Sequence, residues 1–231
     1  MARRLVFIAN EDLGVVSEIS IDFKWFSGYS VSQKQKSIRS MHEKIVQFNS
    51  SLKLLEVSTK SMNQIGVALS AFNLKYFDDN TGKIYSIENI FQSSKVFEDG
   101  GPYRDLLNVH PRVAKMDERL KTSGDLKHFD FNNKIWELEP KTMFYDWLYI
   151  NSLYTNENLS KQILDYNAFT DIEFNDKKSI NCQARSAALF VCLQKTGRLE
   201  QVIKDSVELR KIYSGFRNED LQISFFDKLN N

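Results

Sequence analysis

Chemically reactive side chains gather between Glu88 and Lys95. If Ser86 to Phe97 forms a helix, the Glu88 carboxylate, the Gln92 amide and the Lys95 amine fall at positions i, i+4 and i+7 and share one face. A carboxylate can carry protons to and from a reacting group, and a lysine with a lowered pKa can attack an electrophilic carbon. The same side chains on a solvated helix would form only weak pairs, worth roughly a few tenths of a kcal/mol. The spacing alone therefore leaves a catalytic cleft and an ordinary helix surface both open.

The N-terminal part of the chain has patterns of strands and one helix. Alternating residues over 19–23 predict a strand, with 6–8 as its hairpin partner, and the segment from Ser32 to Asn49 predicts a helix capped by Ser32. Two strand-like runs follow at 52–57 and 66–74, and a polar turn at 78–82 leads to a further strand at 83–85.

Helices are predicted for most of the remaining chain from apolar spacing and from start and stop signals. They are Ser86 to Phe97 with Ser86 as cap, Pro111 to Lys121, Lys141 to Tyr154, Asn158 to Tyr166, Asn181 to Lys195 and Leu199 to Tyr213. We therefore predict an α+β fold: a mainly helical domain with a small β-sheet at 61–231, and an N-terminal extension of hairpin and helix at 1–60.

Composition narrows the class of protein. With 42% hydrophobic and 26% charged residues, the chain has enough apolar material to fold around a core. A net charge of +1 argues against a protein that grips long nucleic acid by neutralising phosphates, although a single modified nucleotide remains a possible substrate. Cys182 and Cys192 are expected to be reduced in a cytoplasmic protein, and the apolar run at 5–9 is too short for a membrane span.

No cofactor is expected from the sequence. His42, His110 and His128 are scattered, and no Cys/His/Asp spacing resembles a metal site. The Gly100-Gly101 pair lacks the residues and the context of a phosphate-binding loop, so we interpret it as a turn.

The string from Ile87 to Phe97, with its Glu, its Phe-Gln pair and its Lys, resembles the signature of the NADAR family of N-glycosidases and ADP-ribosyl glycohydrolases. Further similar segments follow in the family's order over roughly residues 66–200. They are Ser70-Ala71-Phe72-Asn73, the stretch from His110 to Lys115 with Arg119, Lys141-Thr142-Met143, Phe169 to Asn181 and Ala187-Ala188-Leu189.

The chain also departs from the family's usual pattern. A Trp-Gly pair after a late Asp is replaced by Asp176-Lys177-Lys178-Ser179, and a Trp after the Arg-containing helix by Lys127-His128-Phe129, so contacts of those tryptophans do not carry over. These departures, the N-terminal extension and the string from Gly100 to Asp105 resemble the subgroup found beside DarT-type toxins.

The resemblance implies roles for individual residues. Lys95 would act as a nucleophile that forms a Schiff base, and Glu88 as the acid and base. Asp171 is either a second carboxylate of the site or a solvated acid at a strand end. Asn181 is either a helix cap, the slightly preferred reading, or a ligand contact. The remaining candidates are Ser70 at the pocket entrance, Gln92 and Asn73 for ribose hydroxyls, Phe91 or Phe72 for stacking on a base, and Arg104 and Arg119 for phosphate or for surface salt bridges.

The resemblance implies an ADP-ribosyl glycohydrolase that releases ADP-ribose from guanine bases of DNA, as antitoxin to a DarT-type ADP-ribosyltransferase. Two alternatives stay open: an N-glycosidase of phosphorylated intermediates of riboflavin synthesis, and a non-catalytic immunity protein that binds the toxin. The second alternative would use the extension around Trp25-Phe26 and the helix from Ser32 to Asn49, although these aromatics equally fit a core turn.

Overall fold

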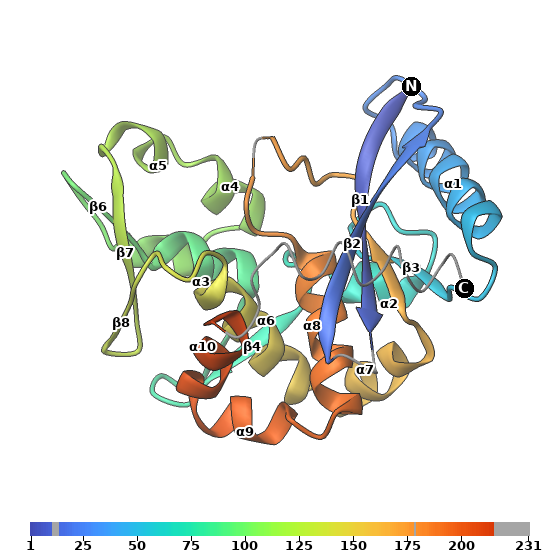
Figure 1. Ribbon diagram of the computed structural model, residues 1–231. Coiled ribbons are helices and arrows are strands. Elements are labelled where there is room, and N and C mark those ends of the chain that lie inside the picture. Colours follow the sequence, from blue (N-terminus) through green and yellow to red (C-terminus); the bar gives the residue numbers. More distant parts are fainter. Residues whose placement is uncertain (11–13, 178, 215–231) are drawn as a thin grey trace.

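The computed structural model describes residues 1–10, 14–177 and 179–214 (Figure 1). A four-stranded sheet has the order β2-β1-β9-β3. The strands β1 (Ala2–Asn10) and β2 (Val15–Phe23) form the expected antiparallel hairpin. On the other side of β1 lies β9 (Ala168–Thr170), antiparallel to it, and β3 (Leu54–Glu56) runs parallel to β9. Strands that are far apart in the sequence thus share one sheet.

Helices cover both faces of this sheet because side chains alternate along β1. Val6 and Ile8 are in one buried cluster with residues of α1 (Val31–Phe48), whereas Phe7 and Ala9 are in a second cluster with residues of α8 (Gln183–Lys195). The predicted N-terminal helix is confirmed, but its cap is Ser30, whose side chain accepts a hydrogen bond from the Gln33 amide.

The extension is joined to the body by more than strand pairing. The His42 ring on α1 lies with Nε2 2.8 Å from the Thr170 hydroxyl, which donates to the buried Glu56 carboxylate at 2.6 Å. The division of the chain into an N-terminal extension at 1–60 and a second domain at 61–231 stays a prediction.

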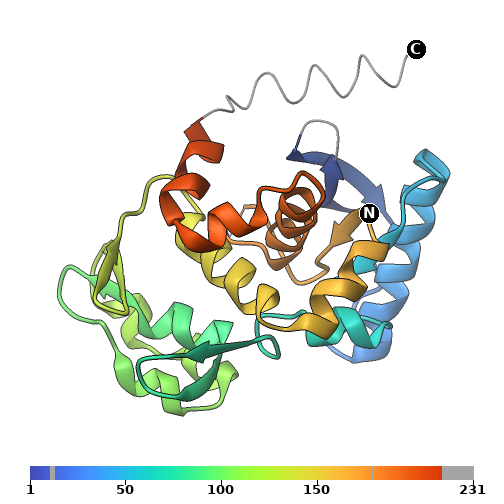
Figure 2. The same cartoon turned by 90° about the horizontal axis from the view of Figure 1, so that it is seen from below.

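The helical body consists of α6 (Met143–Tyr154), α7 (Glu157–Gln162) with the short η2 (Ile163–Asp165), α8, α9 (Leu199–Lys204) and α10 (Ser206–Ser214). Figures 1 and 2 show α6 and α8 between the four-stranded sheet and a second lobe. The α+β class is confirmed. Among the described residues, no helix has the length and hydropathy needed to cross a membrane.

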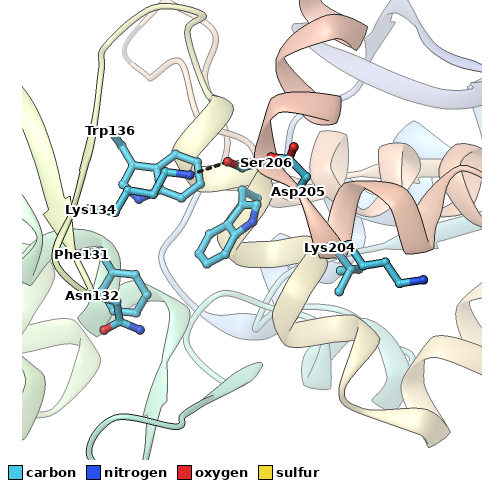
Figure 3. A pocket seen from close by; sticks show the side chains of 9 residues that line it. Phe131, Asn132, Lys134, Trp136, Lys204, Asp205 and Ser206 are labelled. Atoms are coloured by element: carbon cyan, nitrogen blue, oxygen red, sulfur yellow. Dashed lines mark hydrogen bonds between the residues drawn. The ribbon is translucent and has the colours of Figure 1, made fainter.

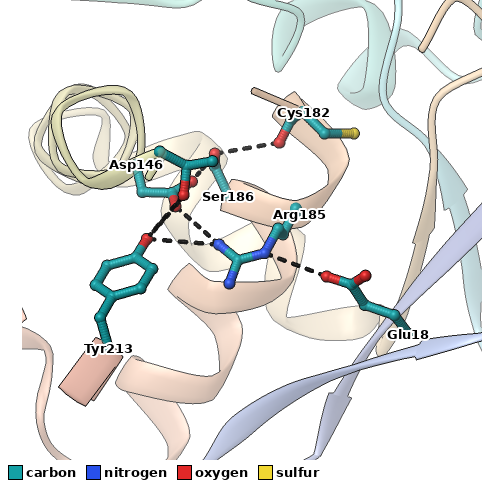
Figure 4. A network of polar contacts seen from close by, with 7 residues as sticks. Glu18, Asp146, Cys182, Arg185, Ser186 and Tyr213 are labelled. Atoms are coloured by element: carbon teal, nitrogen blue, oxygen red, sulfur yellow. Dashed lines mark hydrogen bonds and ion pairs between the residues drawn. The ribbon is translucent and has the colours of Figure 1, made fainter. Parts of the chain in front are cut away.

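A buried polar network holds three of these helices together (Figure 4). Asp146 on α6 is 1% exposed and accepts hydrogen bonds from Arg185 at 2.8 Å, from Ser186 and from Tyr213 on α10. Arg185 also pairs with Glu18 on β2 at 3.3 Å. Because a buried carboxylate needs such partners, the network fixes α10 and β2 against the core.

The second lobe carries the segment of interest. It contains the hairpin β4 (Lys75–Asp78) and β5 (Lys83–Ser86), α3 (Ile87–Ser93), η1 (Arg104–Asn108), α4 (Pro111–Met116) and α5 (Arg119–Thr122). The short helix α2 (Gln64–Ala68), which precedes these elements in the sequence, lies beside β3 and α7 (Figure 1). A three-stranded antiparallel sheet completes the lobe, with β6 (Lys95–Phe97), β7 (Leu126–Phe131) and β8 (Lys134–Trp136). The strands β6 to β8 were not predicted.

Several predicted boundaries are wrong for local reasons. The strand expected at 66–74 is instead α2 and a turn, because the Asn63 side chain caps α2 by accepting from the Ile65 amide. A Cβ on Gly66 would lie 1.9 Å from the Glu56 carbonyl oxygen, so only glycine fits there. The helix expected at 111–121 breaks at Asp117, and the one expected at 199–213 breaks at Asp205, which caps α10 by accepting from the Val207 amide.

Candidate active site

Helix α3 is buried along its whole length and is fixed at its start. The Ser86 hydroxyl accepts a hydrogen bond from the Asn89 amide at 3.1 Å, as the sequence predicted. The Asn89 side chain donates to the carbonyl oxygens of Leu106 and Val109 at 2.6 and 2.9 Å. One face of α3 is thereby tied to η1 and the residue that follows it.

Helix α3 ends earlier than predicted. The Ser94 amide and hydroxyl both donate to the Ile90 carbonyl oxygen, at 3.0 and 2.7 Å, and the chain then enters β6. The expectation that Glu88, Gln92 and Lys95 share one helical face is therefore wrong for Lys95, which is the first residue of a strand.

Glu88 and Gln92 do form a buried pair on α3. Gln92 Nε2 donates to Glu88 Oε1 at 2.8 Å, and the two residues are 6% and 5% exposed respectively. Within the described part of the chain, the oxygen of this amide, Gln92 Oε1, is buried without a hydrogen-bond partner. An unpartnered buried acceptor is costly, and a hydroxyl group of a bound molecule would satisfy it.

Lys115 on α4 completes the surroundings of Glu88. Its Nζ lies 3.8 Å from Glu88 Oε2 and 5.2 Å from the centre of the Phe72 ring. Its side chain is 54% exposed whereas that of Glu88 is 6% exposed, so Lys115 connects the buried carboxylate to the surface.

Lys95 reaches the same cluster from β6. Its Nζ lies 4.9 Å from the centre of the Phe91 ring on α3. Burial lowers the pKa of Lys95 to about 8, with the charge of Glu88 opposing this shift and that of Lys115 adding to it. A lysine in this state has an appreciable fraction of neutral, nucleophilic amine near physiological pH.

Asp171 is buried, with 7% exposure, so a solvated acid at a strand end is excluded. Burial, and then the charge of Glu56, raises the pKa of Asp171 to about 8. The Glu56 carboxylate accepts a hydrogen bond at 2.8 Å from the amide of Ile172, the residue after Asp171. The two acids therefore lie at the same end of β9.

Gln183 at the start of α8 links Asp171 to the helix that carries Glu88. Its Nε2 donates to Asp171 Oδ2 at 3.0 Å, and its Oε1 accepts from the Ala71 amide at 2.7 Å. The Ala71 carbonyl in turn accepts from the Glu88 amide at 3.0 Å. These hydrogen bonds thus run from the Asp171 carboxylate, through Gln183 and Ala71, to the backbone amide of Glu88.

The turn before the hairpin holds the Ser-Ala-Phe-Asn string. The Ser70 hydroxyl and the Asn73 amide both donate to the Val67 carbonyl oxygen, at 2.7 and 2.9 Å. These bonds shape the turn that presents Phe72, and the predicted role of Asn73 toward a ribose stays a prediction.

Two predicted arginines pair with acidic residues, and Asn181 does not have the capping role expected of it. Arg104 pairs with Asp130 at 3.1 Å, and Arg119 pairs with Asp105 and Asp117 at 2.6 and 2.9 Å, so both form the surface salt bridges that were the alternative to phosphate binding. The expectation that Asn181 caps α8 is wrong, because the cap position is Cys182 and has no side-chain bond. Both Cys182 and Cys192 are buried, and the Cys192 thiol donates to the Val15 carbonyl oxygen at 3.1 Å.

Sequence reasoning missed three residues of the cluster. They are Lys115, Gln183 and Tyr145, whose ring packs edge-on against Phe91 at 5.1 Å and whose raised pKa reflects burial and then the charge of Glu88. Lys115 ends the stretch from His110 that resembles the family, but sequence reasoning assigned it no role. No periodicity in the sequence predicts that α4, α6 and α8 pack near α3.

Two surface cavities of about 300 and 620 Å³ lie among the described residues, and neither has Glu88 or Lys95 in its wall. The geometry of the cluster is a better guide to chemistry than cavity size, because its polar groups converge and are desolvated. The half-exposed Lys115 contacts Glu88 and is therefore a side chain that a substrate approaching the Glu88 carboxylate would meet.

Comparison with known families gives one match of nearly the whole chain. A family model described as the DarT1-associated NADAR antitoxin matches residues 2–222. Comparison with curated proteins found no match.

Proposed function

Because the chain belongs to the family of DarT1-associated NADAR antitoxins, we propose that it removes ADP-ribose from guanine bases of DNA and so reverses the damage done by a DarT-type toxin. One observation carries the enzymatic part of this proposal: the partly buried amine of Lys95, with a pKa lowered to about 8, lies against Phe91 on the helix that carries the Glu88–Gln92 pair. An immunity protein that acts only by contact has no need of such a group.

The proposed reaction begins with the neutral amine of Lys95. Its lone pair attacks the anomeric carbon of the ribose, and the electron pair of the carbon–nitrogen bond leaves with the guanine nitrogen. The Glu88 carboxylate takes the proton that the Lys95 nitrogen loses and passes it to the guanine nitrogen.

The sugar ring then opens as Glu88 carries the remaining proton of the Lys95 nitrogen to the ring oxygen, which leaves a Schiff base between Lys95 and the former anomeric carbon. Water adds to that carbon while Glu88 carries one proton of the water to the Lys95 nitrogen. The carbon–nitrogen bond then breaks as Glu88 carries the proton of the new hydroxyl group to the same nitrogen, which releases ADP-ribose and free Lys95. The unpartnered Gln92 Oε1 is suited to accept a bond from a ribose hydroxyl. Asp171 would act as the second carboxylate, from the position that Gln183 fixes.

The test uses a single-stranded oligonucleotide that carries one ADP-ribosylated guanine. Release of ADP-ribose is followed by chromatography, and borohydride is added in a parallel reaction to trap a covalent adduct, which mass spectrometry then maps to a residue. We expect an adduct on Lys95 and none in Lys95→Arg, which keeps the charge but cannot form a Schiff base. Lys127→Arg is the matched control, since Lys127 lies on the neighbouring strand in an exposed pair with Glu98. Full turnover by Lys95→Ala would refute the role of the lysine.

Two comparisons address the alternative functions. Cleavage of a phosphorylated riboflavin-pathway intermediate, with no release of ADP-ribose from DNA, would favour the metabolic N-glycosidase. Protection of cells by a Glu88→Gln/Lys95→Arg protein that binds the toxin stably would favour an immunity protein.

A further inference from the structure

A cavity of about 300 Å³ lies where the β7–β8 hairpin meets α6, α9 and α10 (Figure 3). Its wall combines aromatic and apolar side chains with polar ones. The apolar lining residues are Phe131, Trp136, Trp147 and Ile203, and the polar ones are Asn132, Lys134, Lys204, Asp205 and Ser206. Its volume is at the lower end of the range for small-molecule sites and suits a single nucleotide.

The cavity is close to the proposed nucleophile because of strand register. Lys95 on β6 pairs with Phe129 on β7, and Phe129 pairs with Trp136 on β8. Paired residues point to the same face of a sheet, and neighbouring strands are about 4.8 Å apart. Lys95 and Trp136 therefore lie in one row, about 10 Å apart along the hydrogen-bonding direction, which is the reach of one or two nucleotide units.

The hairpin turn fixes the cationic side of the cavity. Phe131 pairs with Lys134 across the two residues Asn132 and Asn133, both with positive φ, as a tight two-residue hairpin turn requires. The Lys134 amine lies 4.1 Å from the centre of the Trp136 ring and donates to the Ser206 hydroxyl. Its positive charge is thus held against an aromatic wall, where a phosphate of a stacked nucleotide would meet it.

Trp136 also has an unmet hydrogen-bonding requirement. The residue is 5% exposed, and in the part of the chain that the structure describes its Nε1 donor is buried without an acceptor. A carbonyl oxygen or ring nitrogen of a nucleobase is an acceptor of the right kind, and the neighbouring Trp147 ring, 4.7 Å away, offers aromatic surface.

We propose that this cavity binds a nucleobase joined to a phosphate, as a second subsite beside Lys95. The inference rests on the proposed function, which supplies two sources of this chemistry: the adenosine end of ADP-ribose, or a nucleotide next to the modified guanine in the DNA strand. The wall carries two lysines, Lys134 and Lys204, against one carboxylate, Asp205, so its formal charge is positive.

Tryptophan fluorescence reports binding directly, because two of the three tryptophans of the chain line the cavity. In a Trp25→Phe background, the protein is titrated separately with AMP, with ADP-ribose and with an unmodified single-stranded tetranucleotide. Quenching by AMP and ADP-ribose alone identifies the adenosine source, and quenching by the tetranucleotide identifies the DNA source.

Lys134→Glu in the same background is expected to weaken whichever ligand binds by about tenfold, because it reverses the charge that meets the phosphate. Lys121→Glu, an equal charge change on exposed α5 outside the cavity wall, should leave binding unchanged. Absence of binding by all three probes, or equal binding by both variants, would overturn the subsite.

Failure of the proposed function gives a different result. The titrations involve no bond cleavage, so nucleotide binding by the wild-type protein without any hydrolysis of the modified oligonucleotide would refute the glycohydrolase alone. Normal hydrolysis without a response of binding to Lys134→Glu would refute the subsite alone.

Discussion

The amine of Lys95 lies 4.9 Å from the centre of the Phe91 ring, so the proposed nucleophile rests on an aromatic surface that keeps water away from it. Burial lowers its pKa from 10.5 to about 8. Because only the neutral amine attacks carbon, we expect kcat/KM for release of ADP-ribose to rise about tenfold per pH unit below the midpoint and to level off above about pH 8. Rates measured from pH 6 to pH 9.5 on the modified oligonucleotide provide the test. A flat profile would argue against an attacking lysine.

Lys115 tunes this titration from α4. Its charge is one of the causes that lower the pKa of Lys95, and it also lies 3.8 Å from the Glu88 carboxylate. We expect Lys115→Gln to move the midpoint of the pH–rate profile to higher pH, because the repulsion that disfavours the Lys95 ammonium is lost. The shift should be modest, since the Lys115 side chain is half-exposed and screened by solvent. Lys121→Gln is the control, and a shift of equal size there would show that the effect is not local.

Gly101 supports the strand that carries Lys95. It has φ +90, and a Cβ at this position would lie 2.3 Å from the Lys95 carbonyl oxygen. We expect Gly101→Ala to lower the free energy of unfolding by about 2–4 kcal/mol and to reduce activity further than the loss of folded protein explains. Gly82→Ala is the matched control, because Gly82 has φ +65 but nothing within 4 Å of its Cβ, so only backbone strain of about 1–2 kcal/mol applies. Thermal melts and rates of the two variants give the comparison, and equal effects would contradict the steric account.

The sequence predicted helix α3, its Ser86 cap and the burial of its other face because these depend on neighbours within one or two turns. The end of α3 escaped prediction because it depends on Ser94 hydrogen bonds and on pairing of β6 with a strand about thirty residues later. Lys115 and Gln183 escaped for a related reason: each comes from a helix remote in sequence, and only tertiary packing brings it to Glu88 or Asp171. The resemblance to a known family supplied Glu88 and Lys95 as chemistry, and spacing alone placed Lys95 on the wrong element.

Asp171 should affect the pH dependence of stability as well as catalysis. Its pKa is raised from 3.8 to about 8, first by burial and then by the charge of Glu56. The folded state therefore binds a proton that the unfolded state has released between about pH 4 and pH 8, and the stability that this group contributes falls as pH rises through that window. In Asp171→Asn this loss is absent.

Denaturant unfolding at pH 5 and pH 8 should show the wild-type protein losing more stability than the variant between the two values, by at least about 1.4 kcal/mol, the equivalent of one unit of pKa shift. Asp176→Asn, a change at an exposed acid of the same segment, serves as the control and should keep the wild-type difference. The same difference in Asp171→Asn as in the wild-type protein would mean that Asp171 does not hold a proton in the folded state, and its proposed part as a proton-carrying second carboxylate would then be lost.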